Sequence, residues 1–181
     1  MYVMVGAWIN CKDAWTDHPD HTQEDEAYNE AEVQRAVQYA KQYPDIIKMI
    51  AVGNEAMVHW ATSYFVPPSV ILKWVNYLQD LKNEGDLPSD LWITSSDDFA
   101  AWGGASDNYH TEDLNRLIAA VDFISMHTYA FHNSHYSPDY WYSRDPSLSK
   151  IEQIDASMQR AGEFAAGQYN DVKQYLSLIH I

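Results

Sequence analysis

The chain has 181 residues, of which 46% are hydrophobic and 20% are charged, a composition typical of a globular protein with a sizeable core. Its formal net charge of -15 argues against nucleic acid and anionic membranes as partners, because neutralising phosphates requires clustered Lys and Arg. The sequence has no run of about 20 apolar residues that could cross a membrane, and its single cysteine, Cys11, excludes an intrachain disulfide.

Four short apolar runs predict β-strands, and helical patterns alternate with them. In chain order the expected elements are a strand at 2–9, a helix at 24–43, a strand at 46–52, a helix at 67–81, a strand at 91–95, a helix at 113–120, a strand at 121–126 and a helix at 149–167. The strands are apolar nearly throughout, which is typical of parallel strands covered on both faces. The last helix begins with a capping box of Ser149 and Glu152.

The alternation of strands and helices predicts an α/β fold with a parallel sheet, either a doubly wound open sheet or a closed barrel. No glycine-rich nucleotide-binding loop follows any strand, which weakens the case for the open sheet. Polar and aromatic residues follow every strand instead, and in a barrel these positions converge on the C-terminal mouth. They are Asn10, Asn54-Glu55, Ser96-Asp97-Asp98 and His127-Thr128-Tyr129.

Glu55 is the first candidate for chemistry, because it follows the apolar run at 46–52 and then Gly53 and Asn54. A carboxyl group at a strand end surrounded by apolar barrel wall should have a raised pKa. A general acid for a glycosidic oxygen needs such a pKa, since it must carry its proton near neutral pH. The alternative is that Glu55 only caps the next helix.

The segment Ile50-Ala51-Val52-Gly53-Asn54-Glu55 resembles the fourth-strand signature of retaining (β/α)8-barrel glycosidases. The chain as a whole is most similar to glycoside hydrolase family 17, the β-1,3-glucanases. Residues 5–9, 92–96 and 121–131 resemble strands three, five and six of that family. The resemblance implies a partial (β/α)8 TIM barrel, roughly strands three to six with their helices.

The resemblance also implies roles for individual residues. Glu55 matches the acid/base, Asn54 the neighbour that binds the sugar 2-hydroxyl, and Tyr129 a strand-six tyrosine near the nucleophile. His127 stands where many relatives carry Asn, and Ala130 where most carry Pro. The family's nucleophile is a Glu at the end of strand seven, which this sequence does not contain, so we expect the chain alone to be inactive.

The two ends of the sequence give a further expectation. Residues 1–6 lead directly into a strand, and Leu176-Ser177-Leu178-Ile179-His180-Ile181 resembles the translation of a sequencing-library adapter. We therefore expect residues 1–175 to be part of a longer barrel domain and residues 176–181 to be a non-native tail. A genuine strand that is cut short is the alternative for the tail.

Aromatic residues make up 14% of the chain, and the apolar faces of sugars stack on aromatic rings. Trp8 at a strand end and Trp102 and Trp141 in loop-like stretches are the candidates for sugar contact, together with Tyr140 and Tyr142. Trp74 and Trp92 are assigned to the core, as most aromatic residues are. Asp97 is a candidate for binding substrate, although it and Asp98 could simply cap the following turn.

Two other functions remain open. His127, His132 and His135 fall close together and could serve a metal-dependent barrel hydrolase, or the barrel could bind glucan without catalysis. We favour an enzyme that cleaves β-1,3-glucan, with no cofactor and no metal. Its partner would be a β-glucan oligosaccharide or polysaccharide, the full-length protein would be a monomer, and a polymeric substrate leads us to expect an extracellular or periplasmic location.

Overall fold

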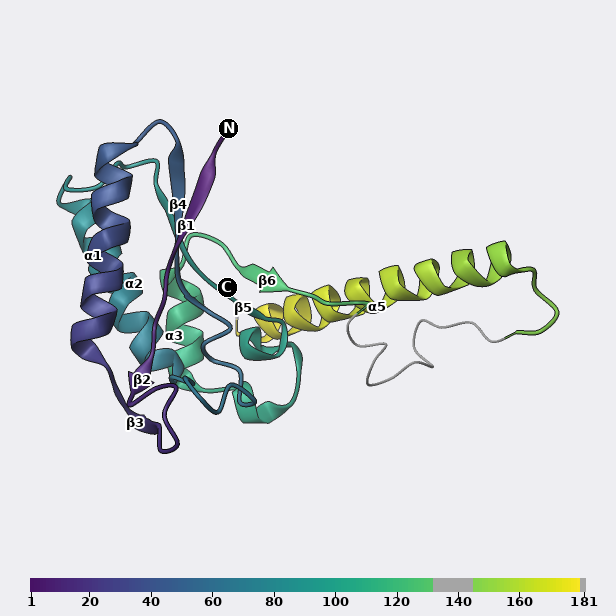
Figure 1. Ribbon diagram of the computed structural model, residues 1–181. Helices are drawn as coiled ribbons and strands as arrows, with labels where there is room; N and C mark the ends of the chain where they lie inside the picture. Colours follow the sequence, from purple (N-terminus) through teal and green to yellow (C-terminus); the bar gives the residue numbers. More distant parts are fainter. Residues whose placement is uncertain (132–144, 180–181) are drawn as a thin grey trace.

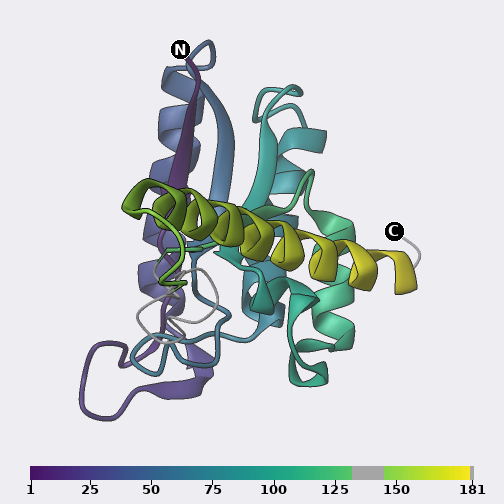
Figure 2. The same cartoon turned by 90° about the vertical axis from the view of Figure 1, so that its right-hand side faces the viewer.

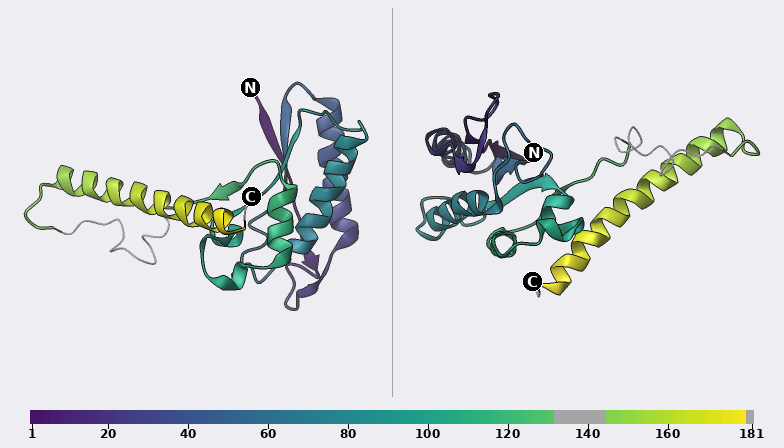
Figure 3. Two further views of the ribbon diagram at one scale, coloured as in Figure 1. Left: turned by 180° about the vertical axis from the view of Figure 1, so that it is seen from behind. Right: turned by 90° about the horizontal axis from the view of Figure 1, so that it is seen from below.

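The computed structural model describes residues 1–131 and 145–179 of the chain (Figure 1). Within this part of the chain, the main sheet has four parallel strands that lie side by side in sequence order: β1 (Val3–Ala7), β4 (Ile47–Asn54), β5 (Trp92–Asp98) and β6 (Ser125–His127). Three helices connect these strands and cover one face of the sheet (Figures 1 and 3): α1 (Glu26–Gln42), α2 (Pro68–Asn83) and α3 (Glu112–Ala120).

The core lies between the sheet and these three helices. Ile50 of β4 pairs with Val5 on one side and Ile93 on the other, and both Ile50 and Ile93 are fully buried. The helices contribute apolar stripes at helical spacing, which is why they pack on the sheet. The buried stripe residues are Val33, Ala36, Val37 and Ala40 in α1, and Ile71, Leu72, Trp74, Val75 and Leu78 in α2.

The order of the strands distinguishes the two architectures that the sequence left open. A doubly wound sheet reverses its strand order and carries helices on both faces. Here the order β1-β4-β5-β6 follows the sequence without reversal, and α1, α2 and α3 share one face (Figure 3). This arrangement is the one found between neighbouring strands of a (β/α)8 barrel.

The predicted helices and strands all exist, but some elements were missed and some boundaries were wrong. A small antiparallel hairpin of β2 (Cys11–Lys12) and β3 (Asp20–Glu24) follows β1, and the short helices η1 (Ala100–Gly104) and η2 (Asp107–Tyr109) follow β5. The last strand was predicted at 121–126, but β6 is only three residues long, Ser125–His127, and residues 121–124 lie outside it.

The final helix, α5 (Lys150–Leu178), is much longer than predicted. The capping box of Ser149 and Glu152 starts it as expected, but it continues past Gly167 and includes residues 176–178, the start of the segment for which a strand was the alternative. Its C-terminal part packs on η1, while its N-terminal part extends away from the sheet (Figures 1 and 2). None of the helices in the described residues combines the length and the apolar character needed to cross a membrane.

The second face of the sheet is not covered as the apolar strands led us to expect. Met4, Met49 and Trp92 are aligned across β1, β4 and β5, and Met4 and Trp92 are exposed. Assigning Trp92 to the core was therefore wrong, whereas Trp74 is a core residue. The helices α1, α2 and α3 lie on the opposite face, so within the described residues this end of the sheet presents apolar side chains to solvent.

We expect the 181-residue chain by itself to associate through this open sheet face, because exposed apolar patches and unpaired strand edges favour contact between copies. The double change Met4→Lys and Trp92→Lys should lower the average mass measured by light scattering across a concentration series. Tyr39→Lys, which alters an exposed aromatic residue on α1, is the control and should leave the mass unchanged. A monomeric wild-type chain with a cooperative melt would contradict this prediction.

Candidate active site

Glu55 lies at the carboxyl end of β4 in an unusual backbone conformation. Its φ is 48° and that of Gly53 is 79°, and a positive φ is strained for any residue except glycine. A Cβ atom on Gly53 would lie 3.0 Å from Ile71 Cδ1, so a larger residue there would require the Ile71 side chain to shift. The Glu55 backbone N–H donates to the Ser96 carbonyl at 2.9 Å, which holds the strained turn against β5.

The alternative role of Glu55 as a helix cap is wrong. The next helix, α2, begins at Pro68 and has Pro67 at its N-cap position, and residues 55–66 form an irregular segment between β4 and α2. The strained conformation instead turns the Glu55 side chain toward β6. Backbone strain of this kind costs about 1–3 kcal/mol and is concentrated at functional sites.

His127 and Tyr129 at the end of β6 both contact the Glu55 carboxyl group. His127 Nδ1 lies 2.8 Å from Glu55 Oε1, and 14% of the Glu55 side chain and 19% of the His127 side chain are exposed. The pKa of Tyr129 is raised to about 12, first because its hydroxyl group hydrogen-bonds to Glu55 and also because of partial burial. The structure therefore brings three predicted site residues together, and Asn54 lies beside them with an exposed side chain.

Asp97 is not a substrate-binding residue, and that prediction is corrected. Its side chain is fully buried, and its two oxygens accept the backbone N–H groups of Met57 at 2.9 Å and Asp98 at 2.8 Å. Asp97 thus fastens the segment after Glu55 to the end of β5. Burial raises the pKa of Asp97 to about 7, although the two N–H donors act in the opposite direction.

Asp98 is closer to solvent and caps the following turn, as one of the two alternatives predicted. Its Oδ1 accepts the backbone N–H of Ala100 at 2.9 Å. Burial raises the pKa of Asp98, and the negative charge of Glu55 acts in the same direction, while His127 opposes it. Asp97 and Asp98 are thus two further carboxyl groups whose pKa values are raised near Glu55.

The predicted sugar-contact tryptophans differ in their outcomes. Trp102 was predicted wrongly: it has no exposed surface, because it lies inside the π-helical turn η1 and its indole N–H donates to the Ser125 carbonyl at 3.1 Å. Trp8 is half-buried at the end of β1, with its indole N–H donating to Asn10 Oδ1 at 2.7 Å. Trp141, Tyr140 and Tyr142 lie outside the described residues.

Trp8 belongs to an aromatic cluster with Trp15 and Tyr64, which we call the aromatic shelf. The Trp15 and Tyr64 rings stack with centroids 4.7 Å apart, and Trp8 lies 5.5 Å from Tyr64. Trp15 is 60% exposed and is fixed by a backbone N–H that donates to the Ser63 carbonyl at 2.8 Å. Burial, then the charges of Glu55 and Asp97, raise the pKa of Tyr64, so the shelf adjoins the glutamate.

Sequence reasoning missed Trp15 and Tyr64, although a usable signal was present. Both lie in segments that follow strands, at the end of the sheet where Glu55 lies. The same criterion that selected Trp102 and Trp141, an aromatic residue in a loop after a strand, would have selected them. Ser96 and Ser125 were also missed as partners of His127: Ser96 Oγ lies 2.7 Å from His127 Nε2 and 3.1 Å from Ser125 Oγ.

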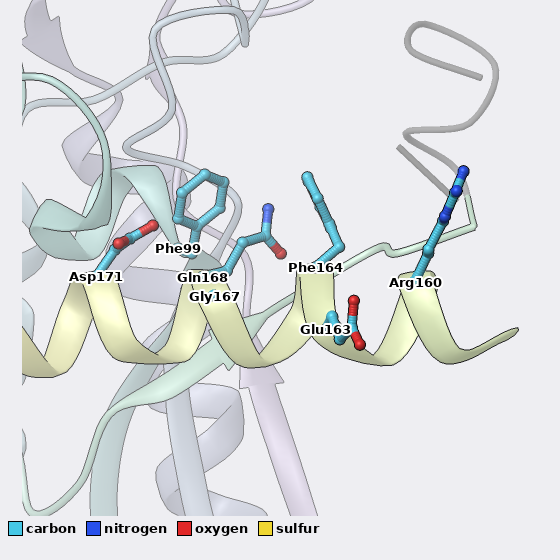
Figure 4. Close-up of a pocket in the computed structure, with 7 residues that line it drawn as sticks. All are labelled: Phe99, Arg160, Glu163, Phe164, Gly167, Gln168 and Asp171. Atoms are coloured by element: carbon cyan, nitrogen blue, oxygen red, sulfur yellow. The ribbon is translucent and has the colours of Figure 1, made fainter. Parts of the chain in front are cut away.

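A separate hollow of about 420 Å³ lies between α5 and Phe99 (Figure 4). Its lining carries charges of both signs, and none of the predicted site residues is among them. The lining residues are Phe99, Arg160, Glu163, Phe164, Gly167, Gln168 and Asp171. Gln168 also accepts a hydrogen bond from the Thr128 hydroxyl group, so the hollow adjoins the end of β6 without containing groups suited to the chemistry of Glu55.

The histidine cluster is only partly visible, because His132 and His135 lie outside the described residues. Among residues 1–131 and 145–179, no three His, Cys, Asp or Glu side chains are arranged to hold a metal ion. His127 uses one ring nitrogen toward Glu55 and the other toward Ser96. Within the described part of the chain, both ring nitrogens of His127 thus have hydrogen-bond partners.

Fold and site together define a class of protein: a sequentially ordered parallel α/β sheet with an ionisable centre at the carboxyl ends of its strands. Glu55 directly follows β4, has hydrogen-bond partners at the end of β6 and has an exposed aromatic surface beside it. Active sites of barrel enzymes lie at this edge of the sheet.

The chain is similar to a solved protein of this class, an endo-laminarinase from Formosa Hel1_33_131 known from a crystal structure. The two are 55% identical with a TM-score of 0.95, and the match covers 100% of this chain. The chain spans 47% of the length of that protein. No family model matches the sequence, and no match was found among curated proteins.

Asp97 gives a prediction about stability that depends on pH. Its pKa is about 7 in the folded chain against an ordinary value of 3.8, so between these values the folded state holds a proton that the unfolded state has lost. Its contribution therefore falls as the pH rises from 4 to 7. A pKa difference of about three corresponds to about 4 kcal/mol.

The measurement is urea unfolding at several pH values, in a hybrid protein in which residues 1–175 replace the matching segment of the Formosa endo-laminarinase. Asp97→Asn should destabilise the protein by about 1–3 kcal/mol at pH 7, because one backbone N–H loses its acceptor. The advantage of the wild type should be larger at pH 4 than at pH 7. Asp17→Asn, at an exposed position, is the control. A wild-type advantage that grows with pH would contradict the prediction.

Proposed function

We propose that this chain is the acid/base-bearing part of a retaining β-glycoside hydrolase that cleaves β-1,3-glucan of the laminarin type within a (β/α)8 barrel. The observation that carries the proposal is the position of Glu55, in a strained turn at the carboxyl end of β4 and hydrogen-bonded to His127. The similarity to an endo-laminarinase over the whole chain supports the substrate class, and the resemblance to glycoside hydrolase family 17 supports the retaining mechanism.

The proposed reaction uses Glu55 twice. In the first step Glu55 protonates the glycosidic oxygen while a carboxylate attacks the anomeric carbon and forms a covalent glycosyl-enzyme. In the second step Glu55 removes a proton from water, and the oxygen of that water replaces the enzyme carboxylate at the anomeric carbon. Asn54, beside Glu55, is the proposed partner of the sugar 2-hydroxyl group.

The attacking carboxylate belongs to another part of a longer protein in this proposal. A retaining mechanism needs two carboxyl groups about 5 Å apart. Asp97 and Asp98 are the described carboxyl groups whose pKa values are raised by burial and also by the charge of Glu55. Asp97 is buried with both oxygens accepting N–H groups, and Asp98 is committed to the turn at Ala100. A glutamate at the end of a seventh strand is the proposed nucleophile.

In the hybrid protein, Glu55→Gln should lower kcat on laminarin at least about 1,000-fold, because an amide cannot donate the proton to the leaving group. Glu30→Gln, on the exposed side of α1, is the matched control and should keep full activity. The measurement is the rate at which new reducing ends appear, and the sizes of the products report whether cleavage is internal. Unchanged activity in the Glu55 variant would refute the assignment.

A second assay separates the acid/base role from other roles of Glu55. With an aryl β-glucoside whose leaving group needs no protonation, Glu55→Ala should still form the glycosyl-enzyme and then stall. Added azide should speed turnover and yield a glycosyl azide of retained configuration, because azide attacks without a general base. A wild-type hybrid that binds laminarin oligosaccharides without cleaving them would favour a non-catalytic glucan-binding barrel instead.

The aromatic shelf is the proposed surface for a glucosyl unit, because apolar sugar faces stack on exposed aromatic rings. Trp15→Ala in the hybrid protein should raise KM for laminarin about fivefold to tenfold with little change in kcat, as expected for about 1 kcal/mol of lost contact. Tyr43→Ala, which removes an exposed aromatic ring near the amino end of β4, should change neither constant. A loss confined to kcat would show that Trp15 acts otherwise.

A further inference from the structure

His127 is part of a hydrogen-bonded chain that joins β5 and β6 and ends at Glu55, directly after β4. Ser125 Oγ lies 3.1 Å from Ser96 Oγ, Ser96 Oγ lies 2.7 Å from His127 Nε2, and His127 Nδ1 lies 2.8 Å from Glu55 Oε1. Register explains the alignment: Ser96 pairs with Ser125, and His127 is two residues further along β6, on the same face.

The positions of the protons follow from the chemistry of imidazole. A neutral histidine has one N–H donor and one bare nitrogen, and the serine hydroxyl groups can each either donate or accept. If Nδ1 were bare, it would face the lone pairs of an ionised Glu55 carboxylate at 2.8 Å. Contact with the ionised carboxylate therefore requires Nδ1–H, and Nε2 then accepts the proton of the Ser96 hydroxyl group.

We propose that His127 is a positioning residue whose Nδ1–H occupies Glu55 Oε1, so that Oε2 alone carries the proton exchanged with substrate, and that the Ser96 hydroxyl group supports this tautomer by donating to Nε2. This inference rests on the proposed function and adds to it the division of labour between the two carboxyl oxygens. Tyr129, whose hydroxyl group also hydrogen-bonds to Glu55 and lies 3.3 Å from His127 Nδ1, is a second partner of the same carboxyl group.

The division of labour keeps the proton balance simple. When the glycosidic C–O bond breaks, its electron pair stays on the leaving oxygen, which takes the proton from Oε2. The new carboxylate keeps the Nδ1–H donor at Oε1, which stabilises its charge. When water attacks the glycosyl-enzyme, its proton returns to Oε2 as the new C–O bond forms. His127 gains and loses no proton in either step.

Other titratable groups surround the pair. Among the described residues, those that face Glu55 and His127 are Asp97 and Asp98 from β5, Tyr64 from the segment after β4, and Tyr129 after β6. His127 faces Glu55 from β6 within this group of acidic and phenolic side chains.

The test compares two variants of the hybrid protein. His127→Phe keeps a ring but no donor, and should lower kcat on laminarin roughly 100-fold with little change in KM, because the carboxyl group is no longer oriented. His127→Asn retains an N–H donor near the position of Nδ1 and should restore most of kcat.

Three further measurements separate positioning from a structural role. With an aryl glucoside that needs no protonation, His127→Phe should form the glycosyl-enzyme at nearly the wild-type rate. Ser96→Ala should cost several-fold in kcat and mix the tautomers in the ¹⁵N spectrum of histidine-labelled protein. His110→Phe, whose native ring stacks on Tyr175 at 4.0 Å outside the site, is the control and should change none of these.

The possible failures are distinguishable. An active wild-type hybrid in which Glu55→Gln is inactive but His127→Phe keeps its kcat would overturn the role of His127 while leaving the proposed function intact. An inactive wild-type hybrid would count against the proposed function. The ¹⁵N spectrum decides the tautomer in either case: a bare Nδ1 with a protonated Nε2 at His127 would overturn the inference, and a protonated Nδ1 would support it.

Discussion

The contact between Glu55 and His127 organises the site, and it joins residues that are 72 positions apart in the sequence. It exists only because the parallel strands are in a particular register, with Asp98 opposite His127 and Ser96 opposite Ser125. A slip of one residue would turn these side chains to the other face of the sheet. The polar chain therefore depends on the apolar core beneath it, which fixes the register.

Backbone constraints at the end of β4 serve the same contact. Gly53 allows the chain to turn where a Cβ atom would press on Ile71, and Glu55 itself adopts a positive φ. The cost of that strain is offset by two hydrogen bonds: the Glu55 backbone N–H donates to the Ser96 carbonyl, and the Met57 backbone N–H donates to the Asp97 side chain. Two neighbouring carboxyl groups thus have opposite uses: Asp97 is buried to hold the backbone, while Glu55 stays within reach of solvent.

Much of this could be predicted from the sequence, because the predictions rested on local patterns. Apolar runs and helical spacing gave the strands and helices, and the position of Glu55 after an apolar run selected the candidate acid. The errors arose where contacts distant in sequence decide burial. Trp102 lies in a segment after a strand, so the sequence predicts a loop residue. In the structure it belongs to η1, which places its ring against β6, and α5 packs over η1. Trp92 reads as a core residue, but it lies on the face of the sheet opposite the helices.

The sequence by itself determined the alternation of strands and helices and the choice of Glu55 as the candidate acid, since both depend on neighbours along the chain. Only the tertiary structure decided which oxygen of Glu55 faces His127, that Ser96 lies behind His127, and that Trp15 and Tyr64 stack beside the site. Those facts depend on strand register and on the packing of loops from different units. No local pattern encodes them, because each pair of partners meets only when the sheet is assembled.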